Sequence, residues 1–164
     1  MMGISEYLSD DHERLDSLLS RAAEAEHYID LDSYADFRKG LLRHIGIEEK
    51  IVLPGIARFQ NGEQAGVAQQ IRLDHGALVA LLVPPPTHGI ISTIRLILKS
   101  HNALEESEDG VYHFIDELAG EESYALLEKM ESYPDVPVLP HKEMAGILDV
   151  TRRAVERAGY KAGF

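Results

Sequence analysis

The sequence has 164 residues, of which 45% are hydrophobic, and it contains no cysteine. That length fits a single domain with one substantial core, and the absence of cysteine excludes disulfides, cysteine-ligated zinc and cysteine-held iron–sulfur clusters. The formal net charge of -12 argues against nucleic acid and anionic membranes as partners, because both attract basic faces. The start of the chain has no signal-peptide pattern and the apolar run 77–83 is too short to span a membrane, so we expect a cytoplasmic protein.

Two amphipathic segments occupy the first part of the chain. Leucines at helical spacing follow Ser9, a good N-cap residue, and predict a helix from about residue 8 or 9 to 28. After Asp30, an apolar stripe predicts a second helix that ends at Asn61-Gly62, with Pro54 as a local kink.

Two further helices are predicted on either side of a proline cluster. Residues 63–83 have helical periodicity, and three consecutive prolines at 84–86 end that helix. Thr87 is a suitable N-cap for a fourth helix, which we expect to continue to about Leu118.

Four long amphipathic helices joined by short turns predict an all-α fold, an up-down-up-down four-helix bundle over residues 1–120. Residues 121–164 add further amphipathic helices and a proline-broken loop. We expect this C-terminal extension either to pack outside the bundle or to form the contact of a homodimer.

Two histidine–glutamate pairs stand out on the second and fourth predicted helices. His44 precedes Glu48, and His101 precedes Glu105, each by four positions. Side chains at this spacing share one helix face and can reach the same metal ion. One such pair is usually an incidental surface contact, but two pairs on separate long helices favour a metal site.

The first and third predicted helices each carry one histidine in an apolar frame, His12 and His75. A lone histidine of this kind is more often a core residue than a ligand. However, counting the residues between each predicted turn and the nearest histidines, at a rise of about 1.5 Å per residue, places the histidines of all four helices at similar depths. We therefore predict one buried metal site, formed by His12, His44, Glu48, His75, His101 and Glu105.

The ligand count indicates two metal ions. If His12 and His44 bind one ion, His75 and His101 bind the other, and both glutamates bridge, each ion has two nitrogen and two oxygen ligands. An oxo or hydroxo bridge would add a fifth ligand and leave an open position, as in a reactive centre. Nitrogen and oxygen ligands at such a site suit iron or manganese, and zinc remains an alternative.

The motifs resemble the hemerythrin-like family, also called the histidine–histidine–glutamate cation-binding domain, over about residues 8–118. The resemblance rests on four segments: Asp11-His12-Glu13-Arg14-Leu15, His44-Ile45-Gly46-Ile47-Glu48-Glu49, Asp74-His75-Gly76-Ala77-Leu78 and His101-Asn102-Ala103-Leu104-Glu105-Glu106. It implies a four-helix bundle with two carboxylate-bridged, non-haem iron ions, and the same six residues as ligands.

Two departures separate this chain from the oxygen-carrying hemerythrins. Those proteins have a second histidine four residues after the one on the third helix, where this sequence has Val79. They also have an aspartate five residues after the fourth-helix histidine, where this sequence uses Glu105 at four. The departures favour a centre that reacts with dioxygen, peroxide or nitric oxide over a stable oxygen carrier.

Several polar residues lie beside the predicted ligands. Glu49 and Glu106 are turned about 100° from the bridging glutamates, so we favour solvent-facing positions over supporting roles. Core packing is the preferred interpretation for Tyr112. Asp11 and Asp74 either orient their neighbouring histidines or are exposed.

The remaining histidines lie away from the predicted site. His27 forms a surface pair with Glu24, His88 and His113 are displaced along the fourth helix, and His141 lies in a loop.

Three interpretations of function follow. A module that binds or senses dioxygen or nitric oxide, or responds to iron or redox state, ranks first, because open coordination positions are expected. An enzyme, such as a di-iron oxidase, a peroxidase-like or nitric-oxide-reducing protein or an iron-centre repair protein, ranks lower because no motif indicates an organic substrate pocket. A structural metal or interaction domain is the third.

Overall fold

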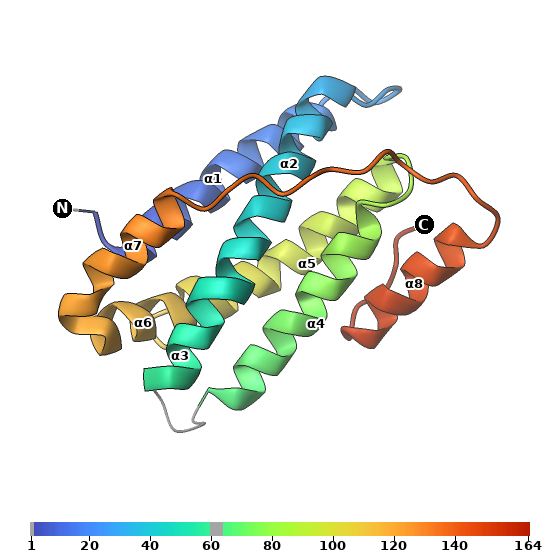
Figure 1. Cartoon of the computed structure of the whole chain (residues 1–164). Helices are drawn as coiled ribbons and strands as arrows, with labels where there is room; N and C mark the ends of the chain where they lie inside the picture. Colours follow the sequence, from blue (N-terminus) through green and yellow to red (C-terminus); the bar gives the residue numbers. More distant parts are fainter. Residues whose placement is uncertain (1, 60–63) are drawn as a thin grey trace.

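The computed structural model describes residues 2–59 and 64–164, and every regular element within them is helical (Figure 1). The all-α class is therefore confirmed. None of the described helices combines the length and apolar character that crossing a bilayer requires.

Helix α1 spans Ile4–Ala22, so both predicted ends are wrong. It begins before residue 8 because the Asp116 carboxylate accepts hydrogen bonds from the first two helical amides, those of Ile4 and Ser5. It ends well before residue 28 because the backbone amide of Asp30 turns back to donate to the Ala22 carbonyl. The Asp30 carboxylate then caps α2.

The second predicted helix is a run of three elements: α2 (Leu31–Ile47), the π-helical turn η1 (Glu48–Val52) and α3 (Leu53–Phe59). Pro54 has no amide proton to donate to a carbonyl of the preceding turn. The turn before it is wide, and the Leu53 amide donates to the Glu48 carbonyl. The predicted kink is therefore a π-helical turn, and the predicted end at Asn61-Gly62 lies outside the described residues.

Helices α4 (Ala65–Leu81) and α5 (His88–Glu106) flank the proline cluster. The predicted cap is confirmed, because the Thr87 hydroxyl accepts from the Ile90 amide. The predicted continuous fourth helix is wrong: α5 ends at Glu106, and a turn leads to the separate helix α6 (Val111–Ala119).

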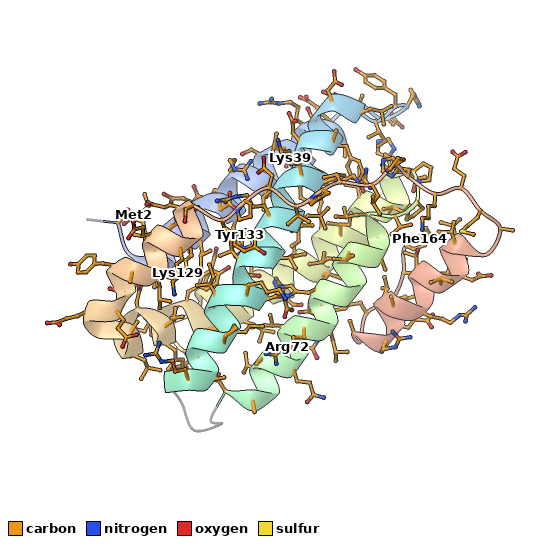
Figure 2. All side chains as sticks on the ribbon, in the orientation of Figure 1. Met2, Lys39, Arg72, Lys129, Tyr133 and Phe164 are labelled. Carbon is orange, nitrogen blue, oxygen red and sulfur yellow. The ribbon has the colours of Figure 1, made fainter. Side chains whose placement is uncertain are left out.

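The C-terminal segment packs on the preceding helices. It comprises η2 (Gly120–Glu122), α7 (Ser123–Glu131) and α8 (Ile147–Arg157), and the connection from α7 to α8 crosses over α2 (Figure 1). Arg43 on α2 donates to the backbone carbonyls of Met130 and Tyr133, at 2.9 and 3.0 Å. Figure 2 labels Tyr133 beside α2, and Phe164 near α8.

Buried apolar side chains form two clusters. The first gathers side chains such as Leu19, Phe37, Leu78 and Ile94. The second gathers side chains from the other ends of the same helices, together with α6 and α7. A layer of buried histidines and carboxylates lies between these clusters along each long helix, and it contains the candidate site.

Candidate metal centre

The structure brings the six predicted ligands together in this polar layer. Each of their side chains is at most 7% exposed. They form two overlapping groups in which one ligand atom per residue lies within 4.8 Å of the others. The groups are His12, His44, Glu48 and Glu105, and Glu48, His75, His101 and Glu105. The two glutamates are therefore shared, as a pair of bridging carboxylates would be.

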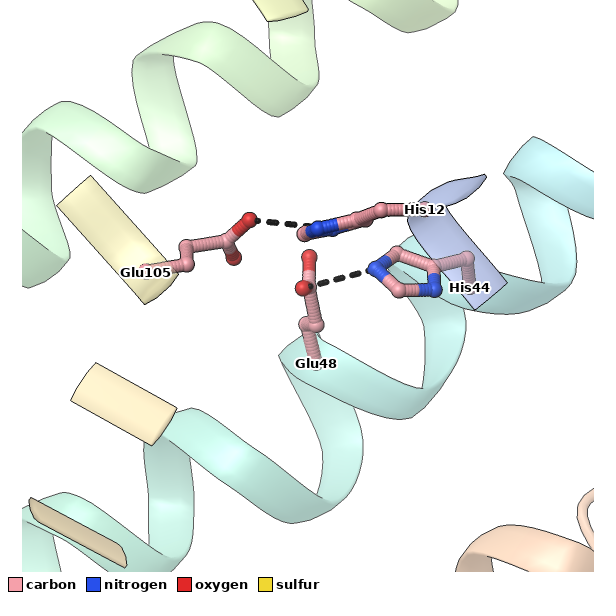
Figure 3. A group of neighbouring side chains, drawn as sticks. All are labelled: His12, His44, Glu48 and Glu105. Atoms are coloured by element: carbon pink, nitrogen blue, oxygen red, sulfur yellow. Dashed lines mark hydrogen bonds and ion pairs between the residues drawn. The ribbon is translucent and has the colours of Figure 1, made fainter. Parts of the chain in front are cut away.

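The Nε2 atom of every histidine in the groups faces a glutamate. His44 Nε2 lies 2.9 Å from Glu48 Oε1 (Figure 3), and His75 Nε2 lies 2.8 Å from Glu48 Oε2. Glu48 thus presents one oxygen to each group.

Glu105 also contacts a histidine of each group. Its Oε1 atom is 3.4 Å from His12 Nε2 (Figure 3) and 3.1 Å from His101 Nε2. The second carboxylate therefore lies across the site from Glu48, between the same two groups.

The outer nitrogen, Nδ1, of each histidine contacts a second carboxylate. The pairs are His12 with Glu106 at 2.5 Å, His44 with Asp11 at 2.8 Å, His75 with Glu49 at 2.6 Å and His101 with Asp74 at 3.1 Å. An ionised carboxylate only accepts hydrogen bonds, so Nδ1 carries the proton in each pair. In the neutral imidazole, Nε2 then has a lone pair that points into the site.

In the metal-free protein, protons on the histidines balance the negative charge of the buried glutamates. Burial disfavours a charged His44, but the negative charge of Glu48 and the hydrogen bonds to Asp11 and Glu48 outweigh it and raise its pKa to about 10. Burial acts against ionisation of Glu48 too, yet the neighbouring histidines hold the pKa of that carboxyl well below its usual range. Burial and the charges of Glu105 and Glu48 raise the pKa of Tyr112 well above normal.

The donor set fits a metal ion. Glu105 is 1% exposed, and neither of its carboxylate oxygens has an aligned hydrogen bond within the described parts of the chain. Its contacts with His12 and His101 are ion pairs, and a cation between the two groups would give the buried carboxylate a direct partner. The buried cluster could therefore hold a metal, although nitrogen and oxygen donors alone do not distinguish iron, manganese and zinc.

The supporting residues differ from those predicted. The preference for solvent-facing positions at Glu49 and Glu106 is wrong, because both carboxylates are hydrogen-bonded to histidines of the cluster. Their positions next to Glu48 and Glu105 in the chain suit this role, since Nδ1 points away from the centre. Asp11 and Asp74 do orient histidines, but on the next helix and not beside them in the chain.

The core position of Tyr112 is confirmed, but the prediction for this residue is incomplete. Tyr112 is fully buried, as core packing requires, but its hydroxyl reaches into the ligand cluster. Val79, at the position of the extra hemerythrin histidine, is 39% exposed. A side chain there points away from the layer that holds His75.

The other histidines lie outside the two groups, as predicted. His27 and His113 are exposed and pair with Glu26 and Glu117, whereas the predicted pairing of His27 was with Glu24. His88 contacts the Ala25 carbonyl.

A crevice of about 310 Å³ reaches the centre between α1, α2 and α5. His12, His44 and His101 lie along it, with apolar side chains such as Leu15 and Leu41. It offers a small molecule a route to the cluster, and no sequence motif indicated it.

The fold and the site together define an all-helical protein with a buried histidine–carboxylate cluster that could hold a metal. No protein-family model matches the chain, and searches of curated proteins and of solved structures gave no match. The particular function is therefore argued from the chain's own residues.

Proposed function

We propose that the chain is a hemerythrin-like protein, an up-down-up-down four-helix bundle that holds two non-haem iron ions. The observation that carries this proposal is the pair of four-residue groups that share Glu48 and Glu105. Under the proposal, α1, the α2–α3 run, α4 and α5 are the four helices of the bundle. His12 and His44 serve one ion, and His75 and His101 serve the other.

The proposed role is to bind or sense dioxygen or nitric oxide. Two bound iron ions would supply redox chemistry and an open coordination position for such a ligand. The chain's own residues orient the imidazoles through the outer carboxylates and exclude bulk water by burying all six ligands. The crevice between α1, α2 and α5 gives a diatomic molecule access.

Iron counting tests the proposal. Metal-free protein is loaded anaerobically with ferrous iron and desalted, and bound metal is measured by mass spectrometry. We expect two irons per chain in the wild type and no more than one in Glu105→Gln, which keeps the side-chain shape but weakens the shared ligand. The exposed Glu13→Gln on α1 is the matched control and should keep two. A wild type that binds no iron, or a Glu105→Gln variant that binds two as tightly, would contradict the proposal.

The crevice also supports a second candidate, a di-iron enzyme. Arg95 and Lys99 line it together with His12, His44 and His101, so it could admit a small polar substrate such as peroxide. Turnover of peroxide or nitric oxide by the iron-loaded wild type, lost in Glu105→Ala and absent from free iron, would favour the enzyme. Binding without turnover would favour the sensing role.

A further inference from the structure

Tyr112 reaches the centre of one of the two ligand groups. Its hydroxyl oxygen lies 3.0 Å from His12 Nε2 and 3.2 Å from His44 Nε2, and it also contacts Glu48 Oε1. The side chain is completely buried. The phenol oxygen therefore contacts three atoms that the proposed function assigns to one metal ion.

These separations match the edges of a coordination shell. An octahedron with metal–ligand bonds of about 2.1 Å has edges of about 3 Å. The distances from the Tyr112 oxygen to both imidazole nitrogens have this length, as does the 2.9 Å from His44 Nε2 to Glu48 Oε1. A cation bound by His12, His44 and Glu48 would therefore have the phenol oxygen beside its ligand atoms.

In the metal-free protein the phenol can donate to Glu48 and accept from the protonated imidazoles, but a bound ion would remove the hydrogen bonds from the imidazoles. Once an ion occupies the site, the single lone pair on each Nε2 is used, and neither nitrogen carries a proton. A phenol that served only as a donor to Glu48 would have no reason to contact both nitrogens. An oxygen ligand of the same ion can lie beside all three.

The break between α5 and α6 places Tyr112 there. In a continuous helix, Tyr112 would lie seven residues, or about 10 Å, beyond Glu105 along the axis. The turn that follows Glu106 is closed by the Gly110 amide, which donates to the Ser107 carbonyl at 2.7 Å. The chain changes direction at this turn, so Tyr112 lies in the same layer as the proposed ligands and not beyond them.

We infer that Tyr112 is a fifth protein ligand of the ion held by His12 and His44, an inference that rests on the proposed two-iron site. The phenol binds as phenolate, its proton passes to solvent, and no other bond changes. The ion held by His75 and His101 keeps four protein donors, so the two ions are inequivalent.

Visible absorption and resonance Raman spectra of the ferric protein test this inference. A phenolate bound to ferric iron gives a visible charge-transfer band, and excitation into that band enhances tyrosine ring vibrations. We expect both signals in the wild type and their complete loss in Tyr112→Phe, which removes one oxygen atom. Tyr34→Phe is the matched control: Tyr34 is 1% exposed, its hydroxyl has no hydrogen bond within the described residues, and it belongs to the apolar cluster.

The outcomes separate this inference from the proposed function. A wild type with two irons and no such band overturns the ligand role of Tyr112 and leaves the two-iron site intact, whether or not the variant folds. A band that survives in folded Tyr112→Phe also overturns it. A wild type that binds no iron overturns both.

Discussion

At the scale of single residues, each imidazole is held from two sides. Nε2 faces the centre, and Nδ1 contacts an outer carboxylate. This arrangement fixes the ring orientation and makes the nitrogen more basic, as supporting carboxylates do at metal sites generally. The outer carboxylates should therefore control metal affinity without being ligands.

The substitution Asp74→Asn tests whether an outer carboxylate controls metal affinity. Asp74 is fully buried between His101 and Gln70, so the isosteric amide keeps the shape and removes the charge that supports the imidazole. We expect metal affinity to fall by about 10- to 100-fold, measured by competition with a chromophoric chelator. Asp36→Asn, an exposed change on α2, should leave affinity unchanged. Equal affinities for the two variants would show that Asp74 does not support the site.

The six residues of the buried cluster could be predicted from the sequence, but the contacts of the outer carboxylates could not. His44 and Glu48 share a face of one helix, and that relation follows from spacing alone. The contact between Asp11 and His44 joins different helices, and its existence depends on how the helices are rotated against each other. Tyr112 was missed for a related reason, because its place depends on a turn after Glu106.

At the scale of elements, breaks in the helices position the site as much as the helices do. The π-helical turn η1 starts at Glu48, and Glu48 and Glu49 both contact His75, at its two ring nitrogens. The cap at Thr87 followed directly from residue type. The break before α6 could not be predicted in this way. Asp109-Gly110 is a recognised turn signal, but apolar periodicity continues on both sides of it.

Gly110→Ala tests the turn between α5 and α6. A Cβ atom at this position would collide with the Glu105 carbonyl oxygen and lie 2.7 Å from the carbonyl carbon and 2.8 Å from the Ser107 oxygen. Backbone atoms cannot move aside easily, so we expect a loss of about 1–3 kcal/mol, seen as a lower Tm in calorimetry. Gly66→Ala, whose Cβ would meet nothing within 4 Å, should match or exceed the wild type. A Gly110→Ala variant as stable as Gly66→Ala would contradict the tight turn.

At the scale of the whole molecule, a charged layer separates two apolar clusters. Its electrostatics should make the stability of the metal-free protein depend on pH. The folded-state pKa of His44 is raised from 6.5 to about 10, so its contribution is complete below pH 6.5 and is lost as the pH rises towards 10. The lowered pKa of Glu48 makes its contribution complete above about pH 4.5 and lost only in stronger acid.

We therefore expect metal-free protein to be most stable between about pH 4.5 and 6.5 and to weaken steadily towards pH 10. Urea unfolding at a series of pH values measures this. Metal-loaded protein should lack the alkaline decline, because the cation replaces the protons that are lost. A metal-free protein with flat stability from pH 6.5 to 10 would contradict the prediction.

The outer carboxylates also link the helices in a closed order. Asp11 on α1 supports a histidine of α2, Glu49 on η1 one of α4, Asp74 on α4 one of α5, and Glu106 on α5 one of α1. Because this order of contacts is closed, none of the linked helices lies at an end from which it could separate at a low cost in free energy. Withdrawing any one helix removes a ligand and leaves another helix's imidazole without its support, so the layer should assemble and come apart as a unit.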